Sequence, residues 1–168
     1  FGGGSDAPDA PAPGASRGAP RPRLTLITLG GWALASADAA GAPTPVFGPS
    51  KPLALLAYLA CAPGRTARRE HLADLLWADL EQDGAHHAFR QTLWYIRQRI
   101  GTDGLASDAV QVSLTADVEV DRDRFDAAVA RQDHEQAVTL YTGDFLPGFA
   151  APGGAEFEQW ADLERGRL

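Results

Sequence analysis

Apolar and polar residues alternate along residues 23–30, the pattern of a half-buried β-strand. Leu24 and Leu26 fall on one face of this strand. A Gly-Gly pair then turns the chain into a second strand around residues 32–35, and a short third strand is predicted at residues 45–47. The opening pattern therefore predicts a small antiparallel sheet.

A period of three to four residues, typical of amphipathic helices, replaces the alternation after residue 50. Ser50 is placed to cap a first helix, which a Pro-Gly pair beginning at residue 63 ends. A second helix is predicted over residues 67–77. A third helix, capped by Asp83, ends at Gly101. Three consecutive helices thus follow the sheet.

Strand-like and helical patterns alternate again in the last third of the chain. Residues 109–114 and 118–120 flank a three-residue tip at 115–117, which predicts a hairpin. Three further helices are predicted, over residues 121–131, over residues 133–141 and from about residue 155 onward. Because the last helix shows no stop signal before Leu168, we expect a helical domain that continues beyond it.

Composition separates the start of the chain from the rest. Fifteen of the first 22 residues are Gly, Ala or Pro, which leaves too few large apolar side chains to offset the entropy of ordering. We therefore expect a disordered tail over residues 1–22, a unit of sheet, helices and hairpin over residues 23–120, and a helical unit over residues 121–168. The predicted fold class is α+β.

Charge is distributed unevenly along the chain. The net charge of −7 would disfavour a nucleic-acid partner if it were spread evenly. Residues 1–116 contain ten acids and ten bases, whereas residues 117–168 contain twelve acids and five bases. Residues 85–101 contain three arginines, two histidines and no acid. The acidity therefore belongs to the C-terminal segment, and the third helix carries an excess of positive charge.

Apolar runs and cysteine content indicate a cytoplasmic protein with no membrane association. The longest apolar run, residues 53–62, is half the length of a bilayer span, and no basic-then-apolar leader opens the sequence. Because the chain contains no Met, we expect the natural N-terminus to lie further upstream. The single cysteine, Cys61, lies in an apolar helix and is predicted to be an unreactive core thiol.

The third helix has two chemically distinct faces. Its apolar stripe consists of Phe89, Leu93, Ile96 and Ile100. The opposite face consists of Gln91 and Gln98 at the centre, His87, Trp94 and Tyr95 beside them, Arg90 and Arg97 on one flank and Arg99 on the other. Amides suit contacts with base edges in the major groove, and arginines suit the phosphates on either side. An ordinary solvated helix would usually mix in acids, and this face has none.

Aromatic residues on the polar face leave two interpretations open. Trp94 and Tyr95 either contact DNA or pack against another protein element, such as the C-terminal helices. Trp77, at the end of the second helix, is either a core residue or an indole whose N–H reaches a phosphate. The pattern alone does not separate these alternatives.

Motifs spread over residues 23–168 occur in an order typical of one family. In the first half they are Arg23-Leu24-Thr25-Leu26, Leu29-Gly30-Gly31, Ser50-Lys51, Leu55-Leu56-Ala57-Tyr58-Leu59, Gly64-Arg65, Glu70-His71-Leu72-Ala73-Asp74-Leu75-Leu76-Trp77, Phe89-Arg90-Gln91-Thr92-Leu93 and Ile96-Arg97. In the second half they are Val118-Glu119-Val120-Asp121, Phe125, Ala137-Val138, Leu140-Tyr141-Thr142-Gly143-Asp144-Phe145-Leu146-Pro147-Gly148-Phe149, Glu156-Phe157-Glu158-Gln159-Trp160 and Glu164-Arg165. With these motifs the chain resembles actinobacterial antibiotic-regulatory (SARP-type) activators, which join an OmpR-like winged helix-turn-helix to a bacterial transcriptional activation domain.

The resemblance implies a transcription regulator that binds direct repeats in promoter DNA, with two copies side by side, and that engages RNA polymerase. It implies a winged-helix domain over residues 23–120 and the start of a tetratricopeptide-like activation domain over residues 121–168. It also places seven residues at the family's DNA-contact positions: Trp77, His87, Arg90, Gln91, Trp94, Tyr95 and Arg97. Gln98 joins this set because it lies at the centre of the same helix face.

The chain departs from the family pattern at three places. Arg68 stands where relatives often have Ser before the second helix, and Trp94 with Tyr95 replaces a small residue and an arginine. No Lys or Arg occurs between Gly101 and Asp121, so the predicted hairpin lacks the cation that OmpR-like wings place in the minor groove. We therefore expect a wing that reads DNA weakly or not at all.

Two other classes of function compete with DNA binding. In a protein-interaction module, the winged helix would no longer bind DNA and the acidic helices would be the active surface. In an enzyme, His71, His86 and His87 would be the candidates, but adjacent helical histidines point about 100° apart and no other group completes a metal site. The sequence also lacks a phosphate-cradling loop. We therefore expect neither catalysis nor a cofactor.

Overall fold

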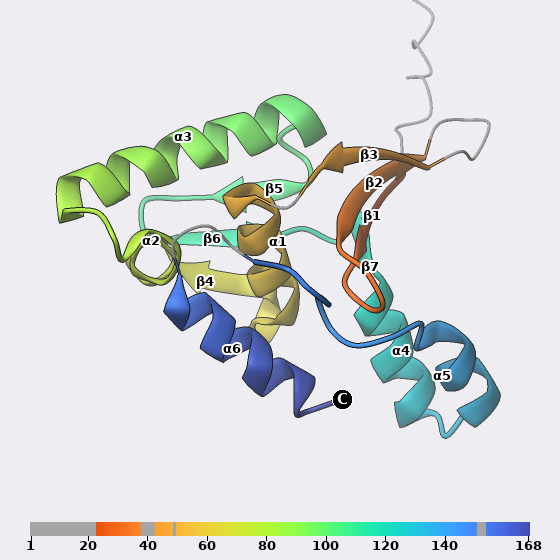
Figure 1. Ribbon diagram of the computed structural model, residues 1–168. Coiled ribbons are helices and arrows are strands. Elements are labelled where there is room, and N and C mark those ends of the chain that lie inside the picture. The colour runs from red at the N-terminus through yellow and green to blue at the C-terminus, as the bar shows by residue number, and fades with distance from the viewer. Residues whose placement is uncertain (1–22, 38–42, 49, 151–153) are drawn as a thin grey trace, which may run out of the picture.

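The computed structural model describes residues 23–37, 43–48, 50–150 and 154–168. It shows a mixed α+β fold, which confirms the predicted class: the described residues form six α-helices and two β-sheets (Figure 1). The tail expected over residues 1–22 lies outside the described residues.

The first sheet has the strand order β3-β2-β1-β7. Its strands are β1 (Arg23–Ile27), β2 (Ala33–Ala37), β3 (Pro43–Phe47) and β7 (Val118–Val120). The first three strands run antiparallel as the alternation predicts, and β7 pairs with β1 in parallel. Leu24 lies opposite Val118 and Leu26 opposite Val120, and all four side chains are buried.

The hairpin predicted at residues 109–114 and 118–120 is wrong. The observed hairpin joins β5 (Leu105–Ser107) to β6 (Gln111–Leu114), and β7 belongs to the first sheet. The turn forms at residues 108–110 because the Asp108 carboxylate accepts hydrogen bonds from the backbone N–H groups of Val110 (2.7 Å) and Gln111 (2.8 Å). The apolar face of β7 is used instead to bury the leucines of β1.

The second sheet has the order β4-β6-β5 and contains a strand that the sequence pattern did not predict. This strand, β4 (Thr66–Arg68), follows a short 3-10 turn, η1 (Pro63–Arg65), and is continuous with the next helix. The predicted start of the second helix at residue 67 is therefore wrong, because residues 66–68 are extended and hydrogen-bonded to β6.

Three helices follow one another as predicted. They are α1 (Lys51–Cys61), α2 (Arg69–Trp77) and α3 (Gln82–Ile100). The predicted side-chain caps are absent: the Ser50 hydroxyl donates to the Gly48 carbonyl instead, and Asp83 lies in the first turn of α3. Helix α1 is the centre of the core, with Leu53, Leu55, Leu56 and Leu59 fully buried.

The C-terminal helices are α4 (Asp121–Ala130), α5 (His134–Leu140) and α6 (Ala155–Arg165). The predicted break between α4 and α5 is confirmed: Gln132 has φ of 58°, and the Asp133 side chain accepts a hydrogen bond from the Gln136 N–H at the start of α5. The prediction that the last helix continues to Leu168 is wrong, because α6 ends at Arg165 with Gly166 as its C-cap.

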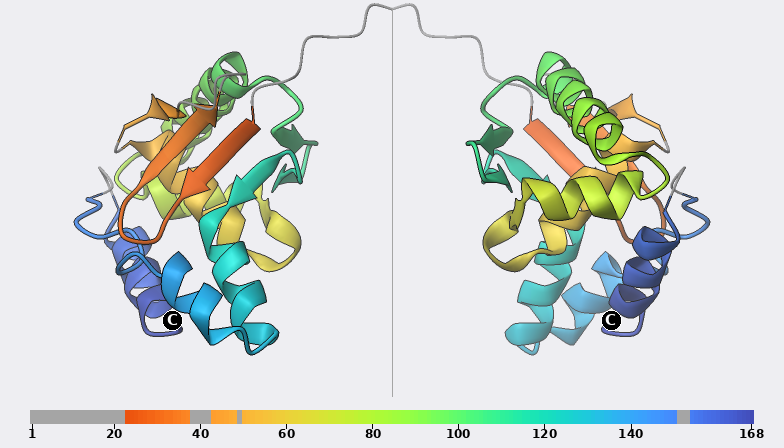
Figure 2. Two further views of the ribbon diagram at one scale, coloured as in Figure 1. Left: turned by 90° about the vertical axis from the view of Figure 1, so that its right-hand side faces the viewer. Right: turned by 90° about the vertical axis from the view of Figure 1, so that its left-hand side faces the viewer.

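Residues of the C-terminal segment complete the core of the N-terminal part. Phe145 and Phe157 are buried in the same hydrophobic cluster as the β1 leucines. The Asp121 carboxylate accepts hydrogen bonds from the backbone N–H and hydroxyl of Thr28 and from the N–H of Leu29 (2.7–2.9 Å). Helices α4–α6 lie on the side of the molecule opposite α3 in all views (Figures 1 and 2). The outward face of α3 is therefore not covered by α4–α6.

Candidate nucleic-acid interface

Helix α3 buries the predicted stripe and exposes the predicted polar face. Phe89, Leu93 and Ile96 are buried, and Ile100 packs against the same core while partly exposed. The exposed residues of the opposite face are His87, Arg90, Gln91, Trp94, Tyr95, Gln98 and Arg99. Seven of the eight predicted contact residues are therefore on α3, and six of these seven are exposed to solvent.

The two aromatic residues of this face have different environments. Tyr95 is 39% exposed, and its ring packs against Phe47 of β3, with 5.6 Å between the ring centroids. The Arg99 guanidinium lies over the Tyr95 ring, 5.2 Å from its centroid. Trp94 is 63% exposed and makes no ring contact with any residue that the structure describes. Tyr95 thus anchors α3 to the first sheet, whereas the Trp94 indole faces solvent.

Arg97 lies on the flank of α3 that faces β5. Its guanidinium donates a hydrogen bond to the Ser107 hydroxyl, and it is half-buried. Its Nε is buried and has no hydrogen-bond partner among the described residues. The contact with Ser107 restrains a long side chain that would otherwise lose rotamer freedom on binding a phosphate.

The Trp77 side chain lies in the hydrophobic core. Its side chain is only 4% exposed and meets Phe89 edge to face, with 5.9 Å between the ring centroids. The Lys51 ammonium lies 5.1 Å from the Trp77 ring centroid. The Trp77 ring therefore packs against the buried side of α3 and is not part of its exposed face.

A small basic hollow beside Arg90 was missed by the sequence reading. It has a volume of about 250 Å³ and is lined by Arg69, Glu70, His86, Phe89, Arg90 and Ala109. The Arg69 guanidinium lies over the Phe89 ring at 5.3 Å and donates to the Asp108 carbonyl (3.0 Å). The adjacent residue, Arg68, is exposed and has an ion-pair contact with Glu70 (3.9 Å). The Arg68-Arg69 pair at the start of a helix is the signal that could have revealed this cluster.

The turn between β5 and β6 is acidic. The pKa of the Asp108 carboxyl is lowered, first by the hydrogen bond from the Gln111 N–H and then by that from the Val110 N–H. The turn therefore carries a negative charge at neutral pH, and Val110 at its tip is 58% exposed. This charge would oppose close approach to a phosphate.

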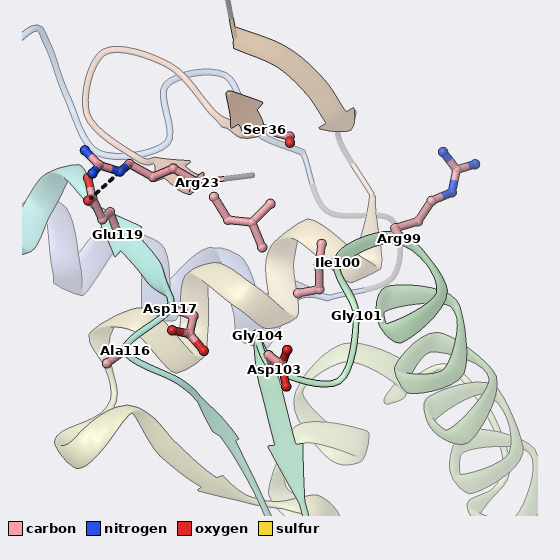
Figure 3. A pocket seen from close by; sticks show the side chains of 11 residues that line it. Arg23, Ser36, Arg99, Ile100, Gly101, Asp103, Gly104, Ala116, Asp117 and Glu119 are labelled. Atoms are coloured by element: carbon pink, nitrogen blue, oxygen red, sulfur yellow. Dashed lines mark ion pairs between the residues drawn. The ribbon is translucent and has the colours of Figure 1, made fainter. Parts of the chain in front are cut away.

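A hollow at the C-terminal end of α3 has mixed charge. It has a volume of about 600 Å³, and an ion pair between Arg23 and Glu119 (3.4 Å) lies at its edge (Figure 3). Asp103 and Asp117 also line it, while Arg99 points away from it. The described residues include no group of three or more His, Cys, Asp or Glu side chains that could hold a metal ion.

Comparisons with known proteins provide one informative match. No protein-family model and no curated protein sequence matches the chain. A solved structure of Mycobacterium tuberculosis EmbR, in complex with a low-affinity phosphopeptide, superposes with a TM-score of 0.64 at 21% sequence identity. The match covers 88% of this chain and 43% of the EmbR chain, so this chain spans less than half the length of EmbR.

This likeness defines the class of fold. The chain shares the mixed α+β fold of the matched part of EmbR. None of the helices that the structure describes is long and apolar enough to cross a bilayer.

Proposed function

We propose that this chain is part of a transcription regulator that binds duplex DNA with α3 in the major groove. In this proposal residues 23–120 are an OmpR-like winged helix, in which α2 and α3 form the helix-turn-helix and the β5–β6 hairpin is the wing. The observation that carries the proposal is the outward face of α3, which is exposed, contains amides and arginines and has no acid from residue 85 to residue 101.

The polar side chains of this surface divide into two roles. Gln91 and Gln98 lie at the centre of the face, where an amide can make paired hydrogen bonds to the N6 and N7 atoms of adenine. Arg90 and Arg97 lie on the flank toward β5, together with Arg69 of the basic hollow, and would contact the phosphates of one strand. Arg99 lies on the other flank, over Tyr95. The amides would set base preference, and the arginines would set affinity.

The acidic turn of the β5–β6 hairpin limits which part of the chain would contact DNA. Asp108 is negatively charged at neutral pH and no Lys or Arg occurs between Gly101 and Asp121, so the hairpin contributes no cationic contact. Base reading would then depend on α3. The resemblance of the sequence motifs to SARP-type activators, together with the fold shared with EmbR, supports the further proposal that the protein binds promoter repeats and engages RNA polymerase through its C-terminal helices.

Selection from random duplexes followed by salt titration tests the proposal. The purified 168-residue chain is used to enrich binding sequences, and affinity for the enriched duplex is then measured by fluorescence anisotropy at several salt concentrations. We expect a defined sequence to be enriched and the logarithm of the association constant to fall linearly with the logarithm of salt concentration. If no sequence is enriched and no duplex binds at low salt, the proposal is wrong and a protein-interaction module is favoured.

A further inference from the structure

We propose that Trp94 is a specificity residue that contacts the C5-methyl group of a thymine in the major groove. This inference rests on the proposed function and extends it to a particular base. It starts from the most exposed aromatic side chain on α3, an indole that is 63% exposed and whose apolar surface a ligand would favourably cover.

The described residues around Trp94 leave its indole largely exposed. Tyr95, its neighbour, is held by Phe47 and Arg99, but no ring or cation among the described residues packs on Trp94. Helices α4–α6 lie on the opposite side of the molecule, so the C-terminal helices described here do not cover it (Figures 1 and 2). The Trp94 indole is therefore accessible to a ligand.

The position of Trp94 on the helix indicates which ligand fits. It is three residues after Gln91 and four residues before Gln98, so all three side chains lie on one face. At about 1.5 Å per residue the three positions span about 10 Å, which corresponds to about three base pairs at 3.4 Å each. Trp94 therefore lies over the bases between those that the two amides would read.

The chemistry of the indole selects among these bases. An apolar side chain on the floor of the major groove has one apolar partner there, the methyl group of thymine, whereas the other base edges present donors or acceptors. Glutamines on either side favour adenine. We therefore infer a short A·T-containing core in the binding site, with a thymine under Trp94.

Replacing thymine by uracil tests this contact because it removes only the methyl group. Each thymine of the enriched duplex is replaced in turn, and affinity is measured for the unmodified chain and for Trp94→Ala. At one position we expect uracil to weaken binding of the unmodified chain about fourfold, the effect of one buried apolar carbon. The Trp94→Ala variant should bind the thymine duplex more weakly and be insensitive to uracil at that same position.

Leu163→Ala is the matched control, because Leu163 is also exposed (67%) and apolar but lies on α6, away from α3. It should change neither the affinity nor the uracil penalty. Circular dichroism checks that both variants remain folded. If Trp94→Ala shows the same uracil penalty as the unmodified chain, the thymine contact is wrong although DNA binding stands. If no duplex binds at all, the proposed function itself fails.

A second copy of the chain is the competing occupant of this face. Light scattering of the DNA-free protein measures its mass with and without Trp94→Ala. A dimer that the substitution converts to a monomer, with an unchanged uracil penalty, would show that Trp94 belongs to a self-interface and would overturn the inference. A DNA-free monomer in both cases, with a uracil penalty that Trp94→Ala abolishes, supports it.

Discussion

In the proposed complex, some side chains of α3 contact bases and others contact the DNA backbone, and the two groups differ in how they affect the salt dependence of binding. We expect Arg97→Ala to weaken binding to all duplexes about equally and to lower the slope of affinity against salt by about one. Gln91→Ala should instead relax preference at one base pair and leave the slope unchanged. Anisotropy titrations at several salt concentrations, on the enriched duplex and its single-base variants, measure both effects.

Arg124 provides the control for Arg97 because it is an exposed arginine on α4, on the side away from α3. Arg124→Ala should leave the salt slope unchanged. Ser107→Ala removes the hydrogen bond that positions Arg97 and should weaken binding without changing base preference. A change of base preference in Arg97→Ala would contradict its assignment to the flank.

The reactivity of the Cys61 thiol depends on its pKa. Burial raises the pKa of its thiol from the model-compound value of 9.0 to about 12, although the Arg122 guanidinium nearby acts in the opposite direction. At pH 8 the folded thiol should therefore react with Ellman's reagent far more slowly than the thiol of the chain unfolded in denaturant. Equal rates in the two states would contradict a partly buried, protonated thiol.

The same raised pKa predicts how stability changes with pH. Between pH 9 and pH 12 the unfolded thiol ionises while the folded thiol stays protonated, so the free energy of unfolding should fall as pH rises through this window. Below pH 9 the thiol is protonated in both states and has no effect. Denaturant titrations of the unmodified chain and of Cys61→Ala isolate this contribution, because the variant has no thiol to ionise.

At the residue scale, the sequence predicts which face of a helix a residue lies on better than it predicts which residues contact one another. The period of α3 was enough to separate Phe89 and Leu93 from Gln91, since helical geometry alone places them on opposite sides. It could not show that Tyr95 packs on Phe47, because that contact joins residues far apart in the chain. The same holds for Trp77, whose burial depends on how α2 meets α3.

The turn between β1 and β2 is in close contact with the residues just before Phe145. Gly30 has φ of 67°, and a Cβ atom there would lie 2.6 Å from the Thr142 carbonyl oxygen. Gly143 lies against the Gly30 Cα at the same point, and the Gly30 N–H donates to the Asp144 carbonyl (2.9 Å). This contact joins the first sheet to the C-terminal segment and leaves no room for a side chain.

We expect Gly30→Ala to lower the free energy of unfolding by about 3 kcal/mol, because it combines a left-handed backbone with a clash against backbone atoms. Gly64→Ala is the matched control, since Gly64 has φ of 62° but no atom within 4 Å of an added Cβ. It should cost only about 1 kcal/mol. Urea denaturation measures both, and equal losses would show that the contact with Thr142 is not tight.

The wrongly predicted hairpin shows why the pairing of strands is harder to predict than the buried face of a helix. Residues 118–120 look like the second strand of a hairpin, yet Val118 and Val120 pair with β1, about ninety residues earlier in the chain. Local pattern identifies a strand but not its neighbour, because pairing is decided by which buried faces meet. The three residues of β4 were missed because so short a strand shows no alternation.

At the scale of the whole molecule, the predicted boundary at residues 120 and 121 is not a boundary in the core. The rings of Tyr58 in α1 and Trp160 in α6 pack against each other at a tilt of 51°, with 4.9 Å between their centroids. Arg122 donates to the almost fully buried carboxylate of Glu164 (2.7 Å) and also contacts the Cys61 sulfur (3.2 Å). Residues 121–168 therefore bury surface that the first part of the chain would expose on its own.

The size of this shared core predicts how a shortened chain behaves. Ending the chain at residue 120 removes Phe145, Leu146, Phe149 and Phe157, each at most 7% exposed. At roughly 1.5–3 kcal/mol for each buried side chain, the loss is on the order of 6–12 kcal/mol, comparable with the total stability of a typical domain. We therefore expect residues 23–120 alone to show no cooperative thermal transition, whereas the 168-residue chain unfolds in one step.

Calorimetry and amide NMR spectra of the two chains distinguish a shared core from two independent units. Glu164→Gln in the full chain provides a milder change, because it leaves the buried Arg122 guanidinium without its closest carboxylate and should lower the melting temperature without abolishing the transition. A dispersed spectrum and a sharp transition for residues 23–120 would instead establish that these residues fold independently. In that case α4–α6 could be removed without loss of the proposed DNA binding, whereas a shared core makes the proposed DNA-reading face of α3 depend on helices on the opposite side of the molecule.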